Sequence, residues 1–211
     1  MRSVTASDTT ITSIEQLRAL YGEPRVSARH KVIDHIDEHV AAYISRSPFL
    51  LMATTAADGK LDVSPKGDPP GFIQVVDEKT LHFPDRPGNN RIDGMQNIVE
   101  TGRIGLIFLI PGIRETLRIN GTAEISIDPD LLASLAHDGK LPRSVVVITV
   151  EEVFMHCAKA MVRSRIWDPA AQIARESVPS MGTILAAHTG GLVDQCDYDS
   201  TLEGRLKTEL Y

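Results

Sequence analysis

Residues 49–66, FLLMATTAADGKLDVSPK, change the pattern of the chain from helical to strand-like. Two segments rich in apolar and β-branched residues, Phe49–Ala56 and Leu61–Lys66, flank the pair Asp58-Gly59. An Asp-Gly pair in this position is typical of a tight hairpin turn, which requires positive φ at its central residues. The stretch therefore predicts an antiparallel β-hairpin, and a mainly β fold is expected around it.

Further strand-like segments follow this hairpin. They are residues 72–76, 80–83, 103–110, 115–127, 144–150 and 153–157, the last of which either continues the segment before it or neighbours it. Residues 103–110 and 144–150 are apolar almost without alternation, as in strands that are buried on both faces. About six to seven closely spaced strands, with one helical interruption at residues 90–101, predict a small β-barrel with flanking helices.

The segments on either side of the barrel have helical patterns. Residues 13–16 have the spacing of a capping box, and Gly22 is expected to end the short helix that follows. A longer helix is predicted from Ser27 to the residue before Pro48, and residues 129–136 and 158–167 are also predicted to be helical. Beyond residue 169 the pattern is helical again, with a last helix near residues 202–210.

These boundaries predict three parts of the chain. Residues 1–48 form an N-terminal tail and two helices that pack on the barrel, residues 49–167 form the barrel, and residues 168–211 form a C-terminal helical extension. Residues 1–12 are rich in serine and threonine and offer little to bury, so they are expected to be poorly ordered.

Composition restricts the class of protein. The chain has 211 residues and a net charge of −6, which argues against a nucleic-acid-binding role because such a role needs a dense basic face. Its apolar runs are too short to span a bilayer, and no secretion signal follows Met1, so a cytoplasmic protein is expected. Of two cysteines, Cys157 is predicted to be a small buried residue and Cys196 a thiol in the tail.

Three histidines near the N-terminus raise the question of a metal site. His30, His35 and His39 lie in the predicted longer helix, the last two four residues apart. No acid or thiol follows at the spacing of a zinc motif, and exposed helix histidines are common, so no metal is predicted.

Residues 83–97, FPDRPGNNRIDGMQN, run from a strand through a turn-rich loop into a helix start. A helix N-terminus presents free N–H groups, and guanidinium groups match phosphate oxygens, so the segment could bind a phosphorylated ligand. Pro-Gly-Asn is also an ordinary turn, and arginines often simply solvate loops. On this segment alone both interpretations stay open.

Two other clusters also follow strands. Residues 62–71, DVSPKGDPPG, carry Ser64 and Lys66, and residues 156–167, HCAKAMVRSRIW, carry several cations and the only tryptophan. Each cluster alone is typical of a solvated loop or an amphipathic helix. Since binding sites often assemble from separate loops at strand ends, the three together predict a site for a ligand with a phosphate and a flat polar ring.

The order of these motifs resembles that of the pyridoxamine 5′-phosphate oxidase-related FMN-binding proteins, the FMN-binding split-barrel family. The motifs are Ser-Pro-Lys-Gly-Asp, Phe-Pro-Asp-Arg-Pro-Gly-Asn-Asn-Arg, Leu-Arg-Ile-Asn-Gly-Thr-Ala and His-Cys-Ala-Lys-Ala, and the match covers about Phe49 to Trp167. The resemblance implies a six-stranded Greek-key split barrel, a homodimer with FMN at the subunit interface, and oxidoreductase chemistry carried by the flavin. It also implies a small-molecule substrate, with NAD(P)H as a candidate donor.

The resemblance further implies roles for ten residues. Arg86, Asn90 and Arg91 would hold the FMN phosphate, and Ser64 and Lys66 would reach the isoalloxazine or ribityl edge. Others would close the site, some of them from the partner chain: Arg118, Asn120, Arg163, Ser164 and Trp167.

One departure from the family pattern concerns the substrate. The true oxidase closes its substrate site with an arginine and a histidine in an Arg-Leu-His type motif near its C-terminus. This chain has Gly204-Arg205-Leu206-Lys207 and no histidine after His188. The departure argues against oxidation of pyridoxamine 5′-phosphate and does not affect flavin binding.

Three functions therefore remain open. The first is an FMN-dependent oxidoreductase acting on an unidentified small substrate. The second is a non-catalytic flavin or haem carrier on the same barrel, in which His137, His156 or His188 would be the candidate haem ligand. The third, a structural dimer with an empty cleft, is disfavoured because several unpaired cations in one cleft would repel each other.

Overall fold

The computed structural model describes residues 9–211, which form two units, residues 9–33 and residues 34–211. In the first unit, α1 (Ile14–Tyr21) follows Ser13, whose side chain accepts a hydrogen bond from the Gln16 N–H. The helix ends at Gly22 with a φ of 67°, which confirms the predicted short helix. α2 (Val26–His30) completes this unit. The expectation for residues 1–8 lies outside the described residues.

The longer helix predicted from Ser27 to Pro48 is wrong, because the chain leaves the helical conformation between α2 and α3 (Glu38–Ile44). In this interval the Ile36 N–H donates to the carbonyl oxygen of Glu78 over 2.7 Å, a partner distant in sequence. Asp37 then starts α3 by accepting a hydrogen bond from the Val40 N–H (2.8 Å).

The break also separates the histidines. His35 precedes α3 and contacts Asp34, 3.0 Å away, whereas His39 lies inside the helix. Within residues 9–211, the structure contains no group of three or more His, Cys, Asp or Glu side chains that could hold a metal ion.

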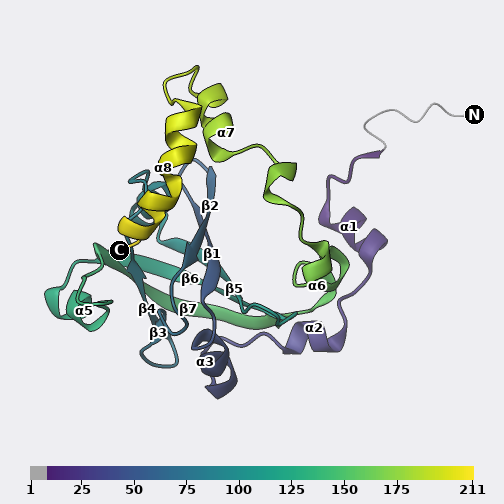
Figure 1. Ribbon diagram of the computed structural model, residues 1–211. Helices are drawn as coiled ribbons and strands as arrows, with labels where there is room; N and C mark the ends of the chain where they lie inside the picture. Colours follow the sequence, from purple (N-terminus) through teal and green to yellow (C-terminus); the bar gives the residue numbers. More distant parts are fainter. Residues whose placement is uncertain (1–8) are drawn as a thin grey trace, which may run out of the picture. The chain divides into compact units, whose positions relative to one another are not determined.

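Seven antiparallel strands form one sheet in the order β2-β1-β5-β6-β7-β4-β3 (Figure 1). The strands are β1 (Phe49–Thr55), β2 (Leu61–Gly67), β3 (Gln74–Val75), β4 (Thr80–Asp85), β5 (Arg103–Leu109), β6 (Thr116–Ser126) and β7 (Ser144–His156). The pairing of β1 with β2 confirms the predicted hairpin. The six-stranded Greek-key split barrel is not confirmed, because the sheet has seven strands and is not closed, with β2 and the two-residue β3 at its edges.

Residues 144–150 and 153–156 form the single strand β7, which pairs with β6 along its length and with β4 over its first half. The register shifts at a β-bulge between Asn120 and Gly121. A Cβ atom at position 121 would lie 2.1 Å from the carbonyl oxygen of Thr149, so only glycine fits this close approach.

The two faces of the sheet differ in their burial. Leu50 and Met52 of β1 and Leu106 and Phe108 of β5 point into the core and are almost fully buried. The residues between them point to the opposite face, where Leu51 pairs with Pro65 of β2 and Ile107 of β5. These three residues give this face an apolar part, although its side chains are only partly buried or exposed.

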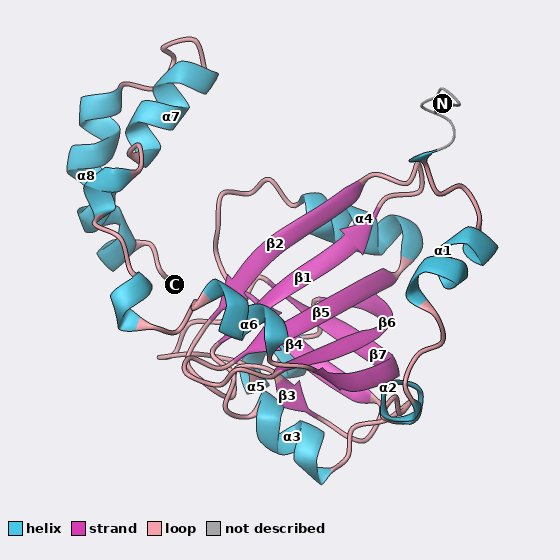
Figure 2. Ribbon diagram, turned by 90° about the vertical axis from the view of Figure 1, so that its right-hand side faces the viewer, coloured by secondary structure: helices cyan, strands magenta, loops and turns pink. Residues whose placement is uncertain are grey.

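The remaining helices connect or follow the strands. They are α4 (Asp93–Thr101), α5 (Pro129–Ser134), α6 (Lys159–Ser164), α7 (Met181–His188) and α8 (Gln195–Thr208), with short 3₁₀ turns at Pro169–Ala171 and Arg175–Ser177. Asn97 ties α4 to β1 by donating to the Thr54 hydroxyl (3.0 Å), and both side chains are buried. α7 and α8 form a helical hairpin (Figure 2). No helix among the described residues is long and apolar enough to cross a membrane.

Both cysteines are free and exposed. The prediction that Cys157 is buried is wrong, because β7 has already passed its last buried residue, Val153, before the chain reaches it. The prediction of a tail thiol at Cys196, on α8, is confirmed.

Candidate functional site

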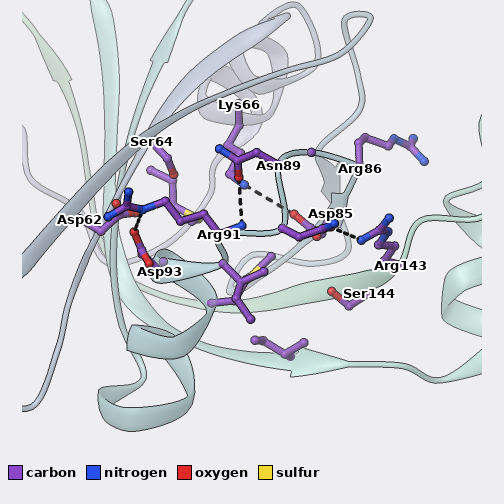
Figure 3. A pocket seen from close by; sticks show the side chains of 17 residues that line it. Asp62, Ser64, Lys66, Asp85, Arg86, Asn89, Arg91, Asp93, Arg143 and Ser144 are labelled. Atoms are coloured by element: carbon purple, nitrogen blue, oxygen red, sulfur yellow. Dashed lines mark hydrogen bonds and ion pairs between the residues drawn. The ribbon is translucent and has the colours of Figure 1, made fainter. Parts of the chain in front are cut away.

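A pocket of about 430 Å³ lies where β2, the end of β4 and the start of α4 meet (Figure 3). Its lining includes five of the ten residues predicted to bind the cofactor: Ser64, Lys66, Arg86, Asn90 and Arg91. These residues come from the first two motif clusters, which the fold thus brings together from separate segments.

The alternation of β2 supplies one wall of the pocket. Asp62, Ser64 and Lys66 line it, while the residues between them, Val63 and Pro65, are exposed on the opposite face. The Lys66 ammonium lies 3.5 Å from the Asp85 carboxylate at the end of β4. Both side chains are mostly buried, so the ammonium is fixed at the wall of the pocket.

The loop after β4 supplies another wall. Asn90 and Ile92 have φ angles of 58° and 52°, and Arg91 between them is held by its N–H, which donates to the Asn89 side chain (3.0 Å). α4 then begins without any side-chain cap. Gly94, at this end of the helix, lines the pocket, and its N–H has no hydrogen-bond partner within residues 9–211, an arrangement that favours an anion.

Each of the three cations predicted to surround the ligand has a carboxylate partner. Lys66 pairs with Asp85, Arg86 with Asp68 and Arg91 with Asp93. The assumption that these cations are unpaired is therefore wrong, and charge repulsion no longer argues against an empty cleft. These three cations instead each lie beside a carboxylate counter-charge.

The pairs of the two arginines differ in burial. Arg86 Nε donates to Asp68 over 2.7 Å, and the two side chains are 16% and 1% exposed. The side chains of Arg91 and Asp93 are 78% and 40% exposed. In Figure 3 Arg86 points away from Lys66, Asn89 and Arg91. Arg91 is thus free to exchange its partner for a ligand, whereas Arg86 is held firmly.

The other five predicted residues do not line this pocket. On β6, Arg118 lies over the ring of Phe154, 5.0 Å from its centroid, and Asn120 donates to Glu152 (2.8 Å). The other three lie on or after α6, where Ser164 donates to the Met161 carbonyl oxygen (3.2 Å), Trp167 donates to the Ile113 carbonyl oxygen (2.8 Å), and Arg163 is exposed. Within one chain, the third cluster therefore does not join the first two.

Sequence reasoning missed several residues of the pocket. Arg143 and Ser144, at the start of β7, line it, and Arg143 donates to the side chain of Asn90. Asp62, Asn89 and Ile125 line it too. The strand-end rule that singled out Ser64 and Lys66 also applies to Arg143, which directly precedes β7, and to Ser144, the first residue of that strand.

Comparison with known proteins identifies a family whose model matches this chain. The family model described as Pyridoxamine 5′-phosphate oxidase matches residues 36–157. A search of curated proteins finds no match.

Solved structures with similar folds include HupZ from Group A Streptococcus, with 25% identity, a TM-score of 0.46, and coverage of 57% of this chain and 93% of HupZ. An FMN-binding protein from Syntrophomonas wolfei has 12% identity, a TM-score of 0.43, and coverage of 68% of this chain and 97% of its own. HutZ from Vibrio cholerae, described as a heme storage protein, has 11% identity, a TM-score of 0.42, and coverage of 57% of this chain and 93% of HutZ. These scores are too low to carry an argument about function.

Proposed function

Because the chain belongs to the pyridoxamine 5′-phosphate oxidase family, we propose that it binds FMN in the pocket between β2 and α4 and is an FMN-dependent oxidoreductase of a small substrate. The observation that carries this proposal is the uncapped start of α4 beside Arg91 and Lys66. Free helix N–H groups, a guanidinium and an ammonium together fit a phosphate monoester.

The residues present fit the two ends of such a cofactor. The start of α4, Arg91 and Arg143 would hold the phosphate, while Ser64 and Lys66 on β2 would reach the ribityl chain or the ring. When bound, FMN would supply hydride and electron transfer. The Lys66 ammonium, 3.5 Å from its counter-charge Asp85, would lie beside the flavin, where a cationic donor favours the anionic reduced form.

Phosphate binding requires Arg91 to exchange partners. Exposed ion pairs such as Arg91–Asp93 contribute little to stability, so a phosphate can replace the Asp93 carboxylate at low cost. The buried pair of Arg86 with Asp68 is far costlier to separate, because it would leave a buried carboxylate uncompensated. Arg86 would therefore keep its bond to Asp68 and contribute through its terminal nitrogens.

A homodimer would complete the site. Arg118 and Asn120 project from the sheet face that also carries Leu51 and Ile107, an apolar surface that a second copy would cover. From that face they could close the partner's site, which would explain why they lie apart from the pocket of their own chain.

A haem carrier on the same fold is less well supported. Among the described residues that line the pocket there is no histidine. His137 instead stacks on Tyr211, with ring centroids 4.4 Å apart, and His156 and His188 are exposed.

The test compares FMN with riboflavin, which lacks the phosphate. We expect Arg91→Ala to raise the Kd for FMN by ~10-fold or more while changing that for riboflavin little, since a charge-assisted contact to phosphate is lost. Arg29→Ala is the matched control, because Arg29 is also an exposed arginine paired with a carboxylate, Glu23, but lies outside the pocket. Titration monitored by flavin fluorescence measures both constants.

Three results would contradict the proposal: absence of FMN binding by the wild-type chain, an equal loss of riboflavin affinity in Arg91→Ala, or a Soret band in the purified protein. Reduction of the FMN-loaded protein by NADH or NADPH, followed by turnover with an acceptor, separates an enzyme from a carrier.

A further inference from the structure

Asp68 is the centre of a second cluster next to the pocket. It follows directly after β2, and its side chain is only 1% exposed. One carboxylate oxygen accepts from Arg86 Nε (2.7 Å), and the other accepts from the hydroxyl of Tyr211, which lies 143 residues further along the chain. The buried Asp68 carboxylate thus accepts one hydrogen bond from Arg86, beside the pocket, and one from Tyr211, which follows α8.

Tyr211 makes three further contacts in this cluster. Its ring stacks on His137, with centroids 4.4 Å apart and planes at 26°. The Arg86 guanidinium carbon lies 5.7 Å from the centre of the same ring, and the Lys140 ammonium donates to the Tyr211 main-chain oxygen (3.1 Å). The hydrogen bond to Asp68, followed by burial, raises the pKa of Tyr211 to about 12, so the hydroxyl remains a donor at neutral pH.

Arg86 connects this cluster with the pocket. Arg86 is one of the residues that line the 430 Å³ pocket, with its side chain turned away from Lys66 and Arg91, and it also borders a smaller cavity of about 190 Å³ whose walls include Asp68 and His137. Within residues 9–211, only Nε of its guanidinium has a hydrogen-bond partner. The terminal nitrogens are therefore the part available to an anion, and Asp68 and the Tyr211 ring determine where they lie.

We propose that Tyr211 is a positioning residue for the phosphate end of the cofactor, an inference that rests on the proposed function. Its hydroxyl fixes the second oxygen of Asp68, so Asp68 holds Arg86 Nε in one orientation, and its ring limits rotation of the guanidinium. Loss of the hydroxyl leaves Asp68 free to turn and Arg86 free to leave the pocket wall. Because coupling between two sites is reciprocal, a bound phosphate stabilises the contacts of Tyr211 by the same free energy by which these contacts strengthen phosphate binding.

The test is Tyr211→Phe in the full chain, which keeps the ring and removes the hydroxyl. We expect the Kd for FMN to rise ~5- to 10-fold, as for loss of one hydrogen bond to a charged group, with the Kd for riboflavin unchanged. Tyr198→Phe is the control, because Tyr198 lies on α8 and also stacks on an arginine, Arg205, 4.3 Å away, but does not line the pocket. It should bind both flavins like the wild type.

A second readout needs no flavin. In the ligand-free protein, modification of Arg86 by phenylglyoxal, mapped by mass spectrometry, should be several-fold faster in Tyr211→Phe than in the wild type or Tyr198→Phe. Wild-type FMN affinity in Tyr211→Phe, or equal losses for FMN and riboflavin, would overturn the inference. If the wild type binds no FMN, the proposed function fails, and an unchanged phenylglyoxal rate would still refute positioning of Arg86 by Tyr211.

Discussion

Ile92 has a backbone conformation that is costly for its side chain. Its φ of 52° is left-handed, a region that β-branched residues rarely adopt, and its side chain is 54% exposed, so burial compensates little. The residue lies between Arg91 and the uncapped start of α4 and lines the pocket. Strain of this kind gathers at ligand sites, where it fixes the direction of neighbouring groups.

Asparagine at this position should relieve the strain. Because asparagine tolerates the left-handed region, we expect Ile92→Asn to raise the free energy of unfolding by ~1 kcal/mol, measured by chemical denaturation of the ligand-free protein. Val99→Asn is the control: Val99 is 77% exposed inside α4, where asparagine has no conformational advantage. A loss of stability in Ile92→Asn as large as that in Val99→Asn would show that position 92 is not strained.

Sequence patterns located the cations of the site but not their partners. Strand ends and turn residues placed Lys66, Arg86 and Arg91 near one another, since local rules fix where strands stop. Arg91 pairs with Asp93, two residues away, but the carboxylate partners of Lys66 and Arg86 depend on tertiary contacts. Asp68 precedes Arg86 by 18 residues and Tyr211 follows Asp68 by 143, a separation that no local pattern encodes.

At the scale of elements, the α7–α8 hairpin depends on close approach at Gly182. A Cβ atom there would lie 2.6 Å from both the Gln195 carbonyl oxygen and the Asp199 carboxylate, which accepts a hydrogen bond from the Gly182 N–H (2.9 Å). The two helices therefore touch backbone to backbone at this point, and any side chain larger than hydrogen separates them.

Two glycine substitutions in this hairpin should have opposite effects. Gly182→Ala is expected to destabilise the packing of α7 on α8 by ~1–3 kcal/mol, the usual cost of overpacking. Gly204→Ala, within α8 and with no atom within 4 Å of the added Cβ, should stabilise that helix by up to ~1 kcal/mol. Hydrogen exchange of the α7 and α8 amides measures both. Faster exchange in Gly204→Ala, or unchanged exchange in Gly182→Ala, would contradict this description of the hairpin.

Prediction of elements succeeded where local signals and tertiary contacts agree. The β1–β2 hairpin and the strands β5 and β6 follow the sequence pattern closely, because their turns and alternation are local properties. The helix predicted from Ser27 failed, because the Glu78 carbonyl oxygen takes the Ile36 N–H away from a helical partner. A periodic pattern does not reveal such competition.

At the scale of the whole molecule, the outer face of the open sheet exposes several apolar side chains. On β2 the outward residues Leu61 and Val63 are 81% and 62% exposed, and the adjacent β1 and β5 carry Leu51 and Ile107 on the same side. Contiguous exposed apolar surface on a sheet marks an interaction site. An edge strand such as β2 would also present unpaired backbone groups unless it were covered.

A charge in this face should separate the proposed homodimer. Val63 pairs with Ala53 in register, so the arginine of Val63→Arg would stand among apolar side chains at the interface and would pay the cost of losing water. We expect a dimeric wild type and a monomeric Val63→Arg by light scattering at micromolar concentration, with Val99→Arg on α4 remaining dimeric.

If Arg118 and Asn120 serve the partner's pocket, the monomeric variant should also bind FMN less tightly although its own pocket is intact. A monomeric wild type would refute the dimer, and full FMN affinity in a monomeric Val63→Arg would leave the cofactor site complete within one chain.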